Sequence, residues 1–111
     1  MVDKSEELLL LAADNLKMSI DYAVRQMNAR KVRGEVKLRW SRTLTKQVEA
    51  LVKVAEALSK LKGKSGSDLD IASFLSGVQE MVPREYTTRK FVRIVDRARA
   101  SGLRYERIHV Q

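Results

Sequence analysis

The sequence has no cysteine, one proline, five glycines and one histidine among its 111 residues. The absence of cysteine excludes a disulfide framework, a thiolate zinc site and a cysteine nucleophile, and it suits a reducing compartment. The only histidine, His109, lies near the end of the chain with no cysteine to join it, so we expect no catalytic or metal-binding histidine. With so little proline and glycine and 32% charged residues, the composition favours helices over a loop-rich design.

Long apolar runs are also absent. The run LLLLAA at residues 8–13 is too short to cross a bilayer, and Glu6, Glu7 and Asp14 bracket it. The residues before it lack the positively charged segment that opens a signal peptide. We therefore expect a cytoplasmic protein with no membrane partner.

Positive charge is concentrated in two blocks. The net charge is +8 in total, with +6 over residues 30–46 and +5 over residues 84–111, whereas residues 1–29 carry −2 and residues 47–83 carry −1. A uniformly charged surface would serve solubility equally well. The segregation therefore favours a polyanionic partner such as DNA or RNA.

Apolar residues recur every three or four positions in four stretches, which predicts four helices that each bury one face. The stripes are Leu9, Ala13, Leu16, Ile20, Ala23 and Met27; Leu44, Val48, Leu51, Ala55 and Leu58; Ile71, Phe74, Leu75, Val78 and Val82; and Phe91, Ile94, Val95 and Ala98. Thr87 or Thr88 is suited to cap the fourth helix.

The pattern predicts one all-α domain over residues 1–111. We expect a long antiparallel helical hairpin at 1–62, a flexible connection at 63–67, and two shorter helices followed by a tail at 68–111. The tail is predicted to be either a short strand or an extended arm.

The stretch KVRGEVKLRW at residues 31–40 alternates charged and apolar residues, as a strand with a basic face would. The helical stripes on both sides and Gly34 within it favour a break between two helices at 33–35, because glycine disfavours a helix interior and suits the position after a helix end. Basic residues in the preceding turn would complement the helix dipole. These residues are Arg30, Lys31 and Arg33.

Trp40 lies between Arg39 and Arg42 in this block. An exposed tryptophan among arginines could stack on a base of a nucleic acid. A tryptophan that fills the core of the hairpin is the commoner arrangement.

The fourth helix carries a second group of basic residues. Arg89, Arg93 and Arg97 recur every four positions with Lys90 beside them, on the side opposite the apolar stripe. Guanidinium groups in such a row suit phosphate oxygens along a nucleic-acid backbone. The alternative is a solvated surface on which Glu85 pairs with Arg89, and Asp96 with Arg93.

The stretch from Ala72 to the tail resembles the end of a winged-helix DNA-binding domain. In that family a helix that opens with small polar residues reads the major groove, and a Gly-Leu step leads into a wing strand. The span 82–86 departs from the family because it contains Pro83 and exceeds the short turn of the motif. The resemblance implies a reading helix opened by Thr87 and Thr88, a step at Gly102 and Leu103, and a wing over 103–110.

Enzymatic motifs are not complete. The GKS at residues 63–65 would close a phosphate-binding loop, but Leu58 stands where that loop needs its first glycine, and the segment follows a helix instead of a strand. Asp68 and Asp70 at a helix start are explained as cap and dipole partners rather than as metal ligands. We expect neither enzyme activity nor a cofactor.

The sequence therefore predicts a non-enzymatic nucleic-acid-binding protein that contacts phosphates largely independently of base sequence. The alternative is a helical interaction subunit that forms a homo-oligomer or joins a larger ribonucleoprotein complex through its apolar stripes. The candidate contact residues are Arg30, Lys31, Arg33, Lys37, Arg39, Trp40, Arg42, Arg89, Lys90, Arg93 and Arg97.

Overall fold

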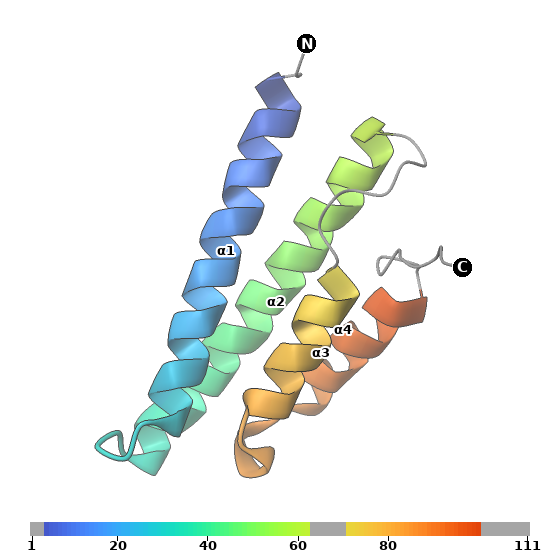
Figure 1. The fold of residues 1–111 in the computed structure, drawn as a ribbon. Coiled ribbons are helices and arrows are strands. Elements are labelled where there is room, and N and C mark those ends of the chain that lie inside the picture. Colours follow the sequence, from blue (N-terminus) through green and yellow to red (C-terminus); the bar gives the residue numbers. More distant parts are fainter. Residues whose placement is uncertain (1–3, 63–70, 101–111) are drawn as a thin grey trace.

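The computed structural model describes residues 4–62 and 71–100, and within these ranges the chain is helical with no strand (Figure 1). The predicted all-α fold, a long hairpin followed by two shorter helices, is confirmed. The predicted connection at 63–67 and the predicted tail lie outside the described residues. The elements are α1 (Lys4–Asn28), α2 (Gly34–Lys62), α3 (Ile71–Met81), the 3-10 helix η1 (Arg84–Tyr86) and α4 (Arg89–Ala100).

The hairpin of α1 and α2 forms one layer of the structure, and α3 and α4 pack together against it (Figure 1). The predicted stripes of all four helices meet in one hydrophobic core, because each helix turns its apolar side toward the others. The largest fully buried side chains are Phe91, Ile20, Met27, Leu44, Leu51, Leu58, Ile71, Leu75, Val48, Val78 and Val95.

The first helix ends earlier than the sequence suggests. The side-chain amide of Asn28 donates hydrogen bonds to the carbonyl oxygens of Val24 and Met81, both at 2.9 Å. Asparagine readily bonds nearby backbone in this way, and the bond to α3 fixes the chain where α1 stops. The prediction that three basic residues occupy the last turn of the first helix is therefore wrong. The connection at 29–33 holds Arg30, Lys31 and Arg33.

Gly34 is the first residue of α2 rather than the residue after α1. The N–H of Lys37 donates to the carbonyl oxygen of Arg33 at 2.9 Å, which closes the first turn of α2. A Cβ atom at position 34 would lie 3.3 Å from the hydroxyl oxygen of Tyr86. Glycine here lets Tyr86 approach the start of α2 closely.

Hydroxyl groups join α2 to the start of α4. Ser41 and Thr45 are the buried polar residues of the described core. The Ser41 hydroxyl donates to the carbonyl oxygen of Tyr86, and the Thr45 hydroxyl donates to the carbonyl oxygen of Ser41 at 3.0 Å. Because the Thr45 proton is used there, the Thr88 hydroxyl donates to Thr45 Oγ1 at 3.0 Å. Thr88 Oγ1 also accepts the N–H of Phe91 at 3.0 Å, so the predicted cap at Thr88 is confirmed.

Replacing Thr88 by alanine should lower the free energy of unfolding by about 1–2 kcal/mol, because α4 loses its cap and Thr45 loses a partner. Urea unfolding followed by circular dichroism measures the difference. Thr88→Ser retains the hydroxyl and should lose less than half as much. Equal stabilities of Thr88→Ala and the native chain would contradict the role assigned to this network.

Candidate nucleic-acid interface

The connection between α1 and α2 and the connection between α3 and α4 lie at the same end of the molecule (Figure 1). Two contacts hold them together: the Asn28 amide bonds the carbonyl oxygen of Met81, and the Ser41 hydroxyl bonds that of Tyr86. These contacts join segments separated by 53 and 45 residues in the chain. The fold thus brings the two basic blocks of the sequence together.

We call this region the basic end and define it by six residues from the two blocks. They are Arg30, Lys31, Arg33, Lys37, Arg84 and Arg89.

All residues of the basic end are exposed except Lys37, which is partly buried. Within the described part of the chain one ion pair involves them, Arg33 with Glu35 at 3.9 Å. Both side chains of that pair are more than 65% exposed (83% and 68%), so water screens it and it neutralises little. Two further acids lie near the basic end: Glu85 in η1, and Glu80, which lines the same surface hollow as Arg84. The basic end therefore keeps a clear excess of positive charge.

Arg84 was not among the residues proposed from the sequence. It lies in η1, directly after Pro83, and it is exposed. A sequence signal existed, because Arg84 is the first residue of the second basic block. Its nearness to the hairpin turn depends on tertiary contacts that no local pattern shows.

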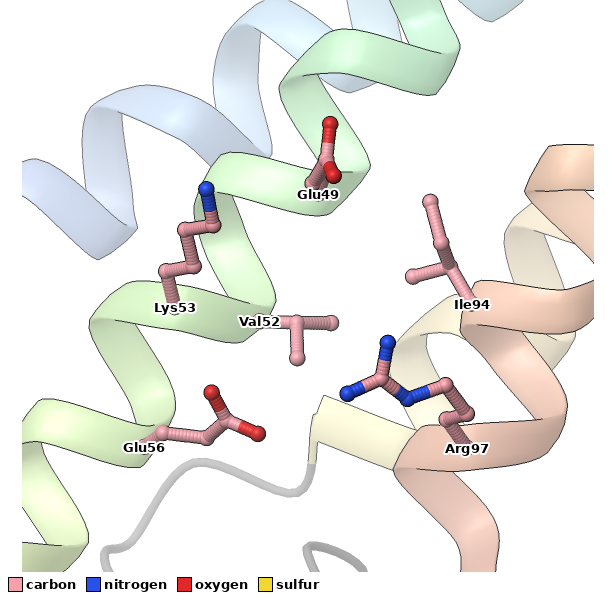
Figure 2. A pocket seen from close by; sticks show the side chains of 6 residues that line it. All are labelled: Glu49, Val52, Lys53, Glu56, Ile94 and Arg97. Carbon is pink, nitrogen blue, oxygen red and sulfur yellow. The ribbon is translucent and has the colours of Figure 1, made fainter.

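The basic row predicted on α4 is divided. Lys90 Nζ lies 3.4 Å from a carboxylate oxygen of Glu49 on α2, and Arg97 points across to α2 on the side of Glu56 (Figure 2). Arg89 and Arg93 are exposed and have no ion-pair partner within the described residues. Of the four cations in the expected row, Lys90 is paired and Arg97 is turned toward α2, whereas Arg89 and Arg93 stay exposed and unpaired within the described residues.

The acid that was expected to pair with Arg93 pairs with another arginine. Asp96 pairs with Arg99 at 3.8 Å rather than with Arg93. Arg99 also donates two hydrogen bonds to the hydroxyl of Ser76 on α3, at 3.1 and 2.7 Å. The hydrogen bonds to Ser76 join α4 to α3, and the pairing of Asp96 with Arg99 leaves Arg93 exposed.

Trp40 is partly buried and packs against the side of the core. Its ring meets that of Tyr22 on α1 edge to face, with centroids 5.5 Å apart and an interplanar angle of 73°. Such a pair stabilises the hairpin and leaves the tryptophan face partly covered. Arg39 and Arg42 are exposed on α2 beside it.

Other kinds of site find little support in residues 4–62 and 71–100. The pocket between α2 and α4 in Figure 2 encloses about 120 Å³, which is below the volume of usual ligand pockets. Two larger hollows, of about 480 and 690 Å³, are more open to solvent. No group of three or more histidine, cysteine or acidic residues in these ranges could hold a metal ion. Among the described helices, none combines the length and apolar character needed to cross a membrane.

No protein-family model, curated protein or solved structure matches the chain.

The charges of the basic end repel one another and make few compensating contacts, so they should not stabilise the fold. We expect Arg30→Gln with Arg84→Gln to leave the free energy of unfolding within about 0.5 kcal/mol of the native value. Moderate NaCl should raise the melting temperature of the native chain by screening this repulsion. Thermal unfolding at low and moderate salt measures both effects, and a melting temperature that falls with salt would contradict the assignment.

Proposed function

We propose that this protein binds nucleic acid without catalysing a reaction and that the basic end is its contact surface. The observation that carries the proposal is the meeting of two basic blocks, far apart in sequence, at one end of the helical fold. Structural demands do not explain this arrangement, because crowding like charges costs stability. A polyanion that bridges both segments would offset that cost.

The chemistry of the surface favours the phosphate backbone over the bases. Four of the six side chains are arginines, whose planar guanidinium groups match phosphate oxygens with paired hydrogen bonds. Lysines at positions 31 and 37 add charge without fixed geometry. Binding should therefore be largely independent of base sequence, and both DNA and RNA are included in the proposal.

Arg93 extends the surface along α4, since it is exposed and lies one helical turn after Arg89. Lys90 and Arg97 contribute less, because acids of α2 already face them. Arg39 and Arg42 lie further along α2 and would reach only a longer ligand. We include the cytoplasmic location expected from the composition in the proposal.

Binding should weaken steeply with salt. Five or six phosphate contacts on duplex DNA predict a slope of roughly −5 in a plot of log K against log salt concentration, since each contact contributes about −0.9. Fluorescence anisotropy with a labelled duplex and with RNA of matched length, measured across NaCl concentrations, gives this slope. A slope near zero would contradict the proposal.

The variant Arg30→Gln with Arg84→Gln removes one charge from each block. It should make the slope about 1.8 less negative, because two contacts are lost. Lys4→Gln with Lys60→Gln is the matched control: it removes the same charge from exposed positions at the start of α1 and near the end of α2, at the other end of the hairpin. Equal loss of affinity in the two variants would show that only net charge matters and would overturn the assignment of the basic end.

A further inference from the structure

One side of α1 is apolar yet uncovered. Leu8, Leu11, Met18 and Tyr22 are each more than half exposed, at 62%, 56%, 65% and 52%. Together with Asn15 they step by three and four residues, which places them on one stripe. Their neighbour Lys17 points elsewhere, because its Nζ lies 5.3 Å from the ring centroid of Phe74 on α3. The stripe is therefore distinct from the sides of α1 that pack on the rest of the fold.

The adjoining side of α2 continues this surface. Gln47, Ala50 and Val54 are partly buried, and together with Trp40 and the exposed Thr43 they step by three and four residues. A groove between the helices is lined by residues of α1 and α2 alone: Asn15, Met18, Ser19, Tyr22, Trp40 and Gln47. We call the stripe on α1 together with this side of α2 the outer face.

A row of charges flanks the outer face on each helix. On α1 the acids recur every seven residues, and each directly precedes a residue of the stripe. On α2 the basic residues have the same spacing and precede positions 40, 47 and 54. The two rows occupy equivalent positions of a heptad and carry opposite charge. The rows are Glu7, Asp14 and Asp21 on α1, and Arg39, Lys46 and Lys53 on α2.

We propose that the outer face binds a second copy of this chain, so that α1 of each copy packs against α2 of the other in an antiparallel four-helix bundle. The two-fold axis would run parallel to the helices, between α1 and α2. In antiparallel helix pairs, equivalent flanking positions face each other across the seam, so the acidic row of one copy meets the basic row of the other. Coverage by a second copy would also remove the exposed apolar stripe from water.

The positions of the charged residues along the helix axis agree with this arrangement. The contact of Tyr22 with Trp40 places these two residues at the same level along the hairpin. Because α1 and α2 are antiparallel, the residue one position earlier on α1 is level with the residue one position later on α2. Asp21, Asp14 and Glu7 then lie level with positions 41, 48 and 55. An axis parallel to the helices preserves height, so each acid lies within two residues, about 3 Å along the axis, of a base on the other copy.

The other face-to-face arrangement has its two-fold axis perpendicular to the helices. It would place α1 against α1 and α2 against α2. The acidic rows would then face each other, and so would the basic rows, which costs energy at every pair. Charge therefore selects the arrangement in which α1 meets α2 of the second copy.

A polar layer lies at the centre of the outer face. Gln47 Oε1 is buried and has no hydrogen-bond partner within the described part of the chain. Asn15 lines the same groove and is level with Gln47 in the register given above. In the dimer the amide group of Asn15 from the second copy could donate to Gln47 Oε1. A single buried asparagine layer of this kind fixes the register of helix pairs.

The proposed dimer does not depend on nucleic-acid binding, but it would enlarge the proposed nucleic-acid-binding surface. Both hairpin turns would lie at the same end of the bundle, so the two basic ends would form one continuous surface.

Sedimentation equilibrium of the native chain without nucleic acid tests the proposal. We expect twice the chain mass of 12.7 kDa. Met18→Lys places a charge in the middle of the outer face and should raise the dimer dissociation constant by about 100-fold or more. Met81→Lys is the matched control, because Met81 is also about half exposed, at 51%, and lies at the end of α3. Circular dichroism should show native helix content in both variants.

Charge exchange tests the pairing of α1 with α2. Asp14→Lys or Lys46→Asp alone should each raise the dissociation constant by about tenfold, since two such pairs turn repulsive in each dimer. The double variant should return it to within about threefold of the native value. A double variant weaker than either single variant would contradict the proposed pairing.

The absence of cysteine allows a single spin label to be placed at Lys31→Cys. The distance between the two labels in the dimer should be shorter than the length of α1, about 37 Å. A longer distance would overturn the proposed axis. A native chain that remains monomeric at all concentrations, or a Met18→Lys variant that dimerises as the native chain does, would overturn the interface itself.

Discussion

The hydroxyl network that joins α2 to the start of α4 determines how the two halves of this fold meet. Ser41 and Thr45 lie in the buried layer between the helices, and their hydroxyl groups engage Tyr86 and Thr88. Apolar packing alone would tolerate small shifts of α4 along α2, because the hydrophobic effect has no direction. Directional bonds between buried groups remove that freedom. The position of the second basic block relative to the first follows from them.

The cost of this arrangement is electrostatic. Exposed cations from both blocks gather at one end, while the acids of α2 face Lys90 and Arg97 instead. The core of the hairpin and of α3 and α4 must hold the end together against this repulsion. Asn28 assists by bonding the last carbonyl group of α3. A bound polyanion would turn the electrostatic contribution of these cations to stability from unfavourable to favourable. This change is the physical basis of the proposed function.

Periodicity in the sequence predicts the helices because burial imposes it: Leu51, Leu75 and Phe91 occupy the positions that their stripes indicate. The end of α1 could not be predicted so well, because Asn28 stops the helix through a bond to a residue far along the chain. The sequence indicates a special role for Gly34 at the end of a helix, but in the structure glycine is favoured there because Tyr86 approaches it closely. The charge blocks were visible in the sequence, whereas their meeting, and with it Arg84, required the tertiary fold.

The central claim is that both basic blocks form one contact surface. Titration of an isotopically labelled sample with a short DNA duplex, followed by two-dimensional NMR of the backbone amides, tests it most directly. We expect the signals of residues 29–37 and of residues 84–93 to move together and to saturate at the same duplex concentration. Movement confined to one of these segments, or strongest in the first half of α1, would contradict the claim.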